Sequence, residues 1–498
     1  MYQGYEMRAF WLQDPRMTAH ELYAGGYDVI VVSYEFLEAN MRDKRDLPAI
    51  IESYLRNDRK GEAPTRPNSA IHSDFWRQIG LPFKRVLLDE GQKVNKHHTA
   101  RHIAAKNIHC KAYIILSGTL MHNKWHDISG MLDFVQSHPF TDHAKFMHAF
   151  SDRDYTGRLY LPASKMVMLQ RFLQPFLISR PASLIQLKEL TRRRVPFRLN
   201  EGEESQIDQL MADYQQAVAA SKASGKKSRI DGIDFDVAGF GILVRAQLAS
   251  LHPLFAKAMV DTETNDHDYD PNKVEPDDEY QAAAMQTEQR RVTREEWLAM
   301  IEECATLRED SGRLDTLLKL YRWLRKDYPQ KKMVIFSQYL RFQDIVAHAF
   351  LRYLDIEVLR FDGTTTEERR KKVRLEFQSC DPAIPLLMTS GAGSVGLNIT
   401  EASIVIQLEP WWNGNNEGQT ISRAYRQGQE DDVIALVLLA TNSLIDTTIM
   451  KTRDTKTMLI ADVMRPLVRD HTQGPEDIQL HKVPNAHPYK FEFPEDDA

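Results

Sequence analysis

Cysteine is scarce in this chain. Only Cys110, Cys304 and Cys380 occur among 498 residues, and they lie far apart in the sequence. Three separated cysteines build neither a disulfide framework nor a four-cysteine zinc ribbon. We therefore expect no zinc, and a protein suited to a reducing compartment.

Long apolar runs and a net positive charge are also missing. No stretch approaches the roughly 18 to 20 apolar residues that a membrane span requires, so we expect no membrane contact. The 64 lysines and arginines face 70 acidic residues, which gives a net charge of −6. Contact with nucleic acid must therefore come from local patches. One basic cluster, Thr191–Arg194, fits a phosphate contact, a weak import signal or a solvated loop.

The most informative stretch runs from residue 385 to residue 429. Two short apolar runs, the second at Ser403–Leu408, each lead into glycine, polar or aromatic residues. This pattern is typical of buried parallel strands whose carboxyl ends open onto functional loops. A helix predicted over Asn415–Arg426 places Gln419, Arg423 and Arg426 on one face. Two guanidinium groups on one stripe suit phosphate, although an isolated pair of this kind is more often a solvated basic face.

A second candidate site follows an apolar strand predicted over Lys84–Gly91. The strand ends in the paired carboxylates Asp89 and Glu90. Metal-assisted phosphoryl transfer uses such a pair, because one carboxylate holds Mg²⁺, usually through water, and its neighbour orients the attacking water. A solvated turn is the alternative. The next strand, Ala112–Leu116, leads into S-G-T-L-M-H-N (117–123) in the same way.

These motifs resemble a known family. The strings S-G-A-G-S-V-G-L-N (390–398), E-P-W-W-N (409–413) and Q-T-I-S-R-A-Y-R-Q-G-Q (419–429) are similar to the last motifs of the Swi/Snf-like ATPases, the double-stranded-DNA translocases of helicase superfamily two. D-E-G-Q (89–92) resembles the family's D-E-G-H, with Gln92 in place of histidine. The loop at 117–123 resembles the third motif, with Leu120 and His122 in place of the commoner proline and glutamine.

The resemblance implies two RecA-like lobes, ATP and Mg²⁺ as cofactors, double-stranded DNA or chromatin as partner, and a nuclear location. It also implies roles for individual residues. The expected catalytic residues are Asp89, Glu90, Arg423 and Arg426, with Asp89 holding Mg²⁺ through water. The expected nucleotide contacts are Gly396 and Gln419. DNA contact or coupling between the lobes is expected of Thr119, Asn123, Ser337, Asn398 and Trp412. Packing is the preferred alternative for Trp411 and Trp412.

The family's phosphate-binding loop, G-x-x-x-x-G-K-[ST], does not occur anywhere in the sequence. That loop supplies the backbone donors and the lysine that hold the β- and γ-phosphates. We expect it ahead of the first predicted strand, Tyr27–Tyr34, where only 26 residues remain and cannot supply the lobe's first elements. The first lobe is therefore expected to be incomplete.

The fold class expected is α/β, with two lobes built from parallel sheets flanked by helices and joined by a helical region and an acidic flexible linker. Within the second lobe, Ser311 is the expected N-cap of the entering helix, and Thr365 and Glu368 are expected to form a capping box. The expected parts are a truncated first lobe (1–180), a helical inter-lobe region (181–260), an acidic linker (261–310), a second lobe (311–469) and a disordered acidic tail (470–498).

Two functions from different classes fit these observations. The first is a Swi/Snf-like ATP-dependent DNA translocase or chromatin remodeller, present as a fragment whose own ATP hydrolysis is impaired. The second is a non-enzymatic scaffold that keeps the helicase fold to bind DNA or a chromatin partner. Retention of both arginines and both carboxylates favours the first, because an abandoned nucleotide cleft would need neither pair. Hydrolysis by this chain itself is left as a separate hypothesis.

Overall fold

A computed structural model describes residues 6–56, 70–121, 124–140, 142–154, 159–180, 187–224, 237–257, 293–362, 366–389, 398–468 and 489–490. The chain divides into two compact units, Met1–Phe176 and Leu177–Ala498. We refer to them as unit 1 and unit 2 and describe each by itself. No helix among the residues described here is long and apolar enough to cross a membrane.

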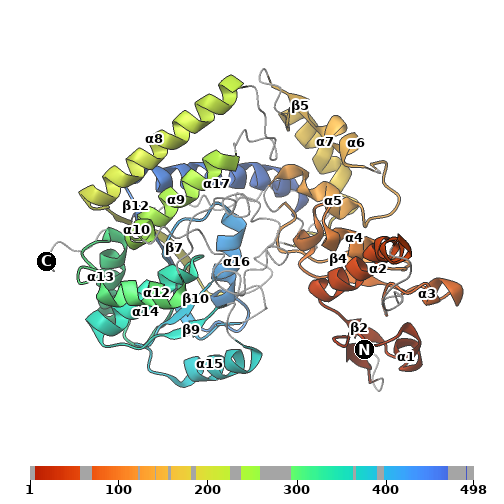
Figure 1. Ribbon diagram of the computed structural model, residues 1–498, viewed down its shortest axis with the longest axis horizontal. Helices are drawn as coiled ribbons and strands as arrows, with labels where there is room; N and C mark the ends of the chain where they lie inside the picture. Colours follow the sequence, from red (N-terminus) through yellow and green to blue (C-terminus); the bar gives the residue numbers. More distant parts are fainter. Residues whose placement is uncertain are drawn as a thin grey trace. The chain divides into compact units, whose positions relative to one another are not determined.

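Unit 2 is built on a seven-stranded sheet in which every pair of neighbours is parallel, in the order β13-β7-β12-β11-β8-β10-β9. Figure 1 labels β7, β9, β10 and β12 of this sheet. Its inner strands are continuous apolar runs, as expected when both faces of a sheet are covered. The strands are β7 (Leu190–Phe197), β8 (Lys332–Phe336), β9 (Leu359–Phe361), β10 (Leu386–Met388), β11 (Ala402–Gln407), β12 (Val433–Ala440) and β13 (Tyr489–Lys490).

Alternate residues of the inner strands β8, β10, β11 and β12 enter two separate cores. On β8, Met333 and Ile335 belong to one core, whereas Val334 and Phe336 belong to the other. The period of two in a strand requires this division. The first core is closed by α8 (Glu201–Ser224), α9 (Val237–Leu251), α10 (Leu254–Lys257), α12 (Arg294–Glu303), α13 (Gly312–Asp327), α14 (Leu340–Leu354) and α17 (Leu444–Met464). The second is closed by α15 (Glu367–Ser379) and α16 (Gly414–Ala424).

This arrangement confirms the α/β class, with a parallel sheet flanked by helices on both faces. The predicted strands at residues 332–338, 403–408 and 434–440 correspond to β8, β11 and β12. Ser311 caps α13 as predicted, since its side chain accepts a hydrogen bond from the Leu314 backbone N–H. The cap of α15 lies one residue later than predicted, at Thr366, whose side chain accepts from the Arg369 N–H. Thr365 lies outside the described residues.

The basic cluster Thr191–Arg194 was expected in a helical region and is a strand instead. It forms part of β7, which pairs with β12 over its whole length from Leu190 to Phe197. Val195 and Phe197 are buried in the first core while Arg192 and Arg193 are exposed. The run of arginines concealed a strand whose apolar half holds it in the sheet of unit 2.

The predicted linker 261–310 is wrong over its last part. Thr293 caps α12 through a reciprocal capping box with Glu296, and Trp297 and Ile301 are fully buried in the first core. Two large apolar side chains four residues apart on one helix face bury enough surface to hold the segment. Residues 258–292 lie outside the described part of the chain, as do residues 470–488 and 491–498 of the predicted tail. Tyr489 and Lys490 of that tail pair with β7.

The described residues of unit 1 form three two-stranded sheets. Strand β1 (Ala9–Trp11) pairs with β2 (Val29–Val31) and β3 (Val86–Leu88) with β4 (Tyr113–Ile115), both parallel, whereas β5 (Asp152–Arg153) and β6 (Leu159–Tyr160) are antiparallel. The helices are α1 (Ala19–Ala24), α2 (Tyr34–Arg56), α3 (Phe75–Gln78), α4 (Ala100–Lys106), α5 (Ile128–Leu132), α6 (His143–Phe150) and α7 (Ala163–Leu173), with 3₁₀ turns η1 (Gly91–Val94) and η2 (Trp125–Asp127). A strand and a helix thus precede β2, where the sequence predicted no such elements.

Candidate functional site

The carboxyl ends of β3 and β4 lie at one edge of their sheet in unit 1. Parallel pairing aligns Leu88 with Ile115, and the ladder continues with Leu116 N–H donating to Leu88 O at 2.9 Å and Gly91 N–H donating to Leu116 O at 2.8 Å. Asp89 and Glu90 therefore emerge beside the loop that begins at Ser117. This is the juxtaposition that the order of strands predicts.

Gln92 connects the two loops. Its Nε2 donates to Glu90 Oε2 at 2.6 Å, and the Ser117 hydroxyl lies 2.7 Å from Gln92 Oε1. Gln92 is buried and Glu90 has a left-handed backbone, with φ of 50°. A side chain at Gly91 would meet Ile115 Cγ2 at 2.1 Å, so only glycine lets the turn lie this close to β4. The substituted glutamine thus keeps a hydrogen-bonded link between the carboxylate pair and the following motif.

Asp89 faces solvent and is oriented by its own backbone. Its Oδ1 accepts from the Glu90 N–H at 3.0 Å, and its carbonyl oxygen accepts from the Tyr34 hydroxyl at 2.8 Å. Burial, and next the negative charge of Asp89, raise the pKa of the Tyr34 phenol above its ordinary value. The hydroxyl therefore stays protonated and remains a donor. An exposed Asp89 carboxylate with fixed backbone is free to bind a hydrated cation.

The loop after β4 leaves one polar atom unused. The Thr119 N–H donates to Ser117 Oγ at 3.0 Å, but Thr119 Oγ1 is buried and has no hydrogen-bond partner among the described residues. Buried polar atoms normally have a partner, so an unused one marks a place for a ligand or a moving group. Asn123, predicted beside it, lies outside the described residues.

In unit 2, the E-P-W-W-N motif follows β11 at the carboxyl edge of the sheet. Glu409 is fully buried and accepts from Gln338 N–H at 2.7 Å, Trp411 Nε1 at 3.0 Å and Ser337 Oγ at 3.3 Å. Burial raises the pKa of Glu409 to about 7, against the opposing hydrogen bonds. Ser337 is itself completely buried. This carboxyl group therefore ties the loop after β8 to the loop after β11, and the Ser337 side chain lies inside unit 2 rather than on its surface.

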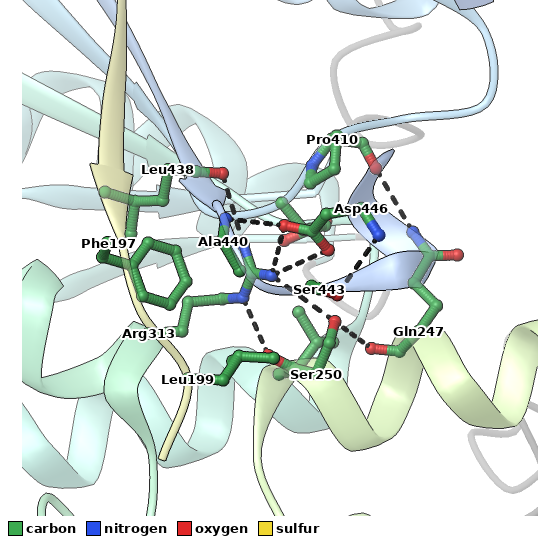
Figure 2. A network of polar contacts seen from close by, with 12 residues as sticks. Phe197, Leu199, Gln247, Ser250, Arg313, Pro410, Leu438, Ala440, Ser443 and Asp446 are labelled. Carbon is green, nitrogen blue, oxygen red and sulfur yellow. Dashed lines mark hydrogen bonds and ion pairs between the residues drawn. The ribbon is translucent and has the colours of Figure 1, made fainter. Parts of the chain in front are cut away.

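The paired tryptophans serve packing, the preferred prediction for them. Trp411 is buried in the second core, and Trp412 packs against the first. Figure 2 shows Gln247 of α9 at the same loop, where its Nε2 donates to Pro410 O at 3.3 Å. Its Oε1 accepts from Trp412 Nε1 at 2.9 Å. The indole of Trp412 is thereby held against α9.

A buried arginine anchors this edge of the sheet, and the sequence reasoning missed it. The Arg313 guanidinium, fully buried on α13, donates through Nη2 to both carboxylate oxygens of Asp446 on α17, at 3.0 and 2.9 Å (Figure 2). Its other donors reach the Leu408 carbonyl at 2.8 Å and the Ser250 carbonyl at 2.9 Å. The available signal was a single cation on the apolar face of S-G-R-L-D-T-L-L (311–318).

The predicted arginine stripe is divided between a helix and a loop. Helix α16 ends at Ala424, so Arg426 lies beyond it and not on its face as predicted. Arg423 is buried, with 9 % of its surface exposed, and its carbonyl accepts from Ile399 N–H at 2.9 Å. Arg426 is exposed, and its Nη1 donates to Asn398 Oδ1 at 2.8 Å. The structure thus brings together Arg426 and Asn398.

Two further predicted residues complete this end of unit 2. Gln419 lies on α16, and its Nε2 is buried without a hydrogen-bond partner among the described residues. Gly396 falls in 390–397, outside the part of the chain that the structure describes. An unused amide donor beside the arginines is what a phosphate or ribose oxygen would satisfy.

The parallel α/β fold and its loop motifs define a protein of the helicase type. Comparison with protein families matches residues 5–231 to the SNF2-related domain and residues 312–428 to the helicase conserved C-terminal domain. The chain belongs to the Swi/Snf-like ATPase family of helicase superfamily two.

Individual relatives match parts of the chain. The DNA repair protein rad5 of Neurospora crassa is 38% identical over 125 residues, which cover 25% of this chain and 10% of that protein. A probable global transactivator of Orgyia pseudotsugata multicapsid polyhedrosis virus is 26% identical over 382 residues, 75% of this chain and 66% of the relative. The Sulfolobus solfataricus SWI2/SNF2 ATPase core, solved in complex with dsDNA, is 17% identical over 92% of this chain and 81% of its own, with a TM-score of 0.34. The chain spans 10% of the length of the rad5 protein and 66% of the length of the transactivator.

Proposed function

We propose that this chain is an ATP-driven translocase that acts on double-stranded DNA in the nucleus, in chromatin remodelling or repair. Membership of the Swi/Snf-like family supports ATP, Mg²⁺ and DNA as its ligands. The observation that carries the proposal is the chain of hydrogen bonds from Glu90 through Gln92 to Ser117. It joins the carboxylate pair to the loop with which relatives communicate nucleotide state.

The carboxylates of unit 1 would share the metal chemistry. Asp89 would hold Mg²⁺ through water, and Glu90 would orient or deprotonate the water that attacks the γ-phosphate. The exposed, oriented Asp89 carboxylate fits a hydrated cation, since Mg²⁺ keeps several of its waters. The Gln92 amide would fix the Glu90 side chain. Thr119, with its unused hydroxyl, would respond to the nucleotide within the same loop.

The arginines of unit 2 would divide the work on phosphate. Arg426 is exposed and is oriented by Asn398, as an arginine finger requires. Arg423 is buried, so its part would be to hold the α16 end in place as well as to add positive charge. Gln419 would donate its unused amide to the nucleotide.

ATP turnover by the 498-residue chain alone should be slow. The sequence contains no G-x-x-x-x-G-K-[ST] string, and therefore lacks the lysine and backbone donors that seat the phosphates. The carboxylates and arginines would then act on a weakly held nucleotide. We expect turnover at least ~100-fold below a rate of about 1 s⁻¹, the low end for ordinary enzymes.

The test is steady-state ATP turnover with and without duplex DNA, together with binding of the duplex measured by fluorescence anisotropy. Glu90→Gln and Arg426→Ala should abolish any DNA-stimulated turnover, and Arg465→Ala, in an exposed ion pair with Asp462, should leave it unchanged. Turnover near 1 s⁻¹ would contradict the slow-hydrolysis part of the proposal. If the chain binds DNA but shows no turnover that Glu90→Gln abolishes, the scaffold function would be favoured. If the chain neither binds DNA nor hydrolyses ATP, the translocase proposal would be overturned.

A further inference from the structure

Unit 1 holds a cluster of imidazoles around one carboxylate, separate from Asp89 and Glu90. His97 precedes α4, His102 lies within α4, and Asp133 follows α5. Asp133 Oδ2 lies 2.6 Å from His97 Nδ1 and 3.2 Å from His102 Nε2. One ligand atom from each of the three lies within 4.8 Å of the others. Two imidazole nitrogens thus converge on a single oxygen.

Hydrogen bonding fixes which nitrogen His102 presents. Its Nδ1 lies 2.7 Å from the Val94 carbonyl oxygen, and a carbonyl can only accept. Nδ1 therefore carries the proton, and in neutral imidazole Nε2 points a lone pair at the Asp133 carboxylate. Two acceptors 3.2 Å apart repel unless a proton or a cation lies between them. The His102 side chain is only 4 % exposed, so water does not relieve this contact.

The surrounding elements hold the three ligands rigidly. Helix α5 packs so closely on the end of η1 that a side chain at Gly130 would come within 1.7 Å of the Asn95 carbonyl oxygen. Ser129 of α5 lies 3.1 Å from His97 Nε2 and 2.7 Å from His143 Nδ1, so it links the cluster to a further imidazole. Such outer partners orient the ligands of a metal site.

We propose that His97, His102 and Asp133 bind a divalent transition-metal ion, with Zn²⁺ the preferred metal. Two imidazoles and one carboxylate suit zinc, with water or His143 in the fourth position. Ligand atoms about 2.0 Å from a tetrahedral zinc lie about 3.3 Å apart. The His102–Asp133 distance of 3.2 Å already fits. The His97–Asp133 distance of 2.6 Å would open by about 0.7 Å, which the partly exposed His97 side chain permits.

Asp133 and His97 are both partly exposed to solvent. Asp133 lines a cavity of ≈ 310 Å³ together with residues of α4 and β4. The expectation of no zinc rested on the shortage of cysteine and did not consider histidine ligands. A metal here would brace η1, the turn that carries Gln92, because Val94 at its end holds His102.

The test uses the full chain purified without chelator. Mass spectrometry should show about one equivalent of zinc per chain. Titration of Co²⁺ into protein from which a chelator has removed the metal should give one site with visible d–d absorption. Asp133→Asn and His97→Gln should each weaken Co²⁺ binding at least ~10-fold. His98→Asn, at the exposed neighbouring histidine, should bind as the unchanged chain does.

Zinc should also raise the melting temperature of the unchanged chain and of His98→Asn but not of Asp133→Asn. Circular dichroism shows whether each variant is folded, and His97→Gln, at the more exposed ligand, carries the test if Asp133→Asn does not fold. Absence of a one-equivalent site, or a site that survives both substitutions, would overturn the proposal and leave a metal-free, ion-paired cluster.

Discussion

The two units hold their candidate loops in different ways. In unit 2, the loop after β11 is fixed by the buried ion pair between Arg313 and Asp446 and by the fully buried carboxyl group of Glu409. In unit 1, the loop after β3 is fixed by the hydrogen bonds that Gln92 makes with the partly exposed Glu90 carboxylate and with Ser117. Removing one partner from a buried charge pair leaves an unpaired charge, whereas a hydrogen bond near solvent is replaced by water.

This difference suits the two roles proposed. A rigid sheet edge in unit 2 presents Arg426 from a fixed frame, while the turn in unit 1 can respond to a ligand at small cost. The difference in energy also predicts how large the stability changes caused by substitutions should be. Measuring these changes tests the contrast between the two units.

Arg313→Met should have the largest effect. It leaves Asp446 buried without its ion pair, so we expect unit 2 to lose about 3–5 kcal/mol of unfolding free energy. Hydrogen exchange of β8 and β11 amides measures this for unit 2 alone. Lys319→Met is the matched control, because Lys319 lies on the same helix and pairs with Asp315 at 3.0 Å in an exposed site, so its change should stay below about 1 kcal/mol.

The double variant Arg313→Met/Asp446→Asn separates lost attraction from unpaired charge. It should be more stable than Arg313→Met alone, because the unpaired Asp446 carboxylate is replaced by a neutral amide. A double variant that is less stable would contradict this account of the pair.

Glu409→Gln should flatten the pH dependence of unit 2. The folded pKa of about 7 lies above the ordinary value of 4.5, so the folded unit binds this proton more tightly than the unfolded chain does. Its stabilising contribution is fully present below pH 4.5 and is lost as the pH rises through 7, a decline of order 3 kcal/mol. Urea unfolding at several pH values should show this decline in the unchanged chain and in Glu430→Gln, but not in Glu409→Gln.

Gln92→Ala should cost unit 1 less, about 2 kcal/mol, because it removes one hydrogen bond to the partly exposed Glu90 carboxylate and one neutral hydrogen bond to Ser117. Exchange of β3 and β4 amides gives the measurement. Gln136→Ala, whose exposed side chain donates to the Lys111 carbonyl, is the control and should change stability by less than about 0.5 kcal/mol. A loss at Gln92 as large as that of Arg313→Met would remove the contrast between the units.

Thr293→Ala should have the smallest effect, about 1 kcal/mol on α12, through loss of its N-cap. Amides of residues 295–303 should exchange roughly five times faster, since 1.4 kcal/mol corresponds to a factor of ten. Rapid exchange of these amides already in the unchanged chain would contradict the helix and restore the predicted linker.

Periodicity and the order of elements along the chain predicted strands β8, β11 and β12 and a parallel sheet, because buried parallel strands are continuous apolar runs of recognisable length. They also predicted that Asp89 and Glu90 lie close to the loop at Ser117, since neighbouring parallel strands end at the same edge of a sheet. Strand β7 escaped prediction because three successive arginines hide its apolar half. Helix α12 escaped because the acidic segment before it dominated the composition.

The amino-acid pattern is enough to predict which loops carry polar residues, to indicate their family, and to show that the sequence contains no phosphate-binding string. Three features follow from the packing of the folded chain: α16 ends before Arg426, Gln92 joins Glu90 to Ser117, and Arg313 meets Asp446 across 133 positions. Local propensity sets elements over a few residues. Which polar atoms find partners depends on packing between segments remote in the chain, and no local pattern encodes it.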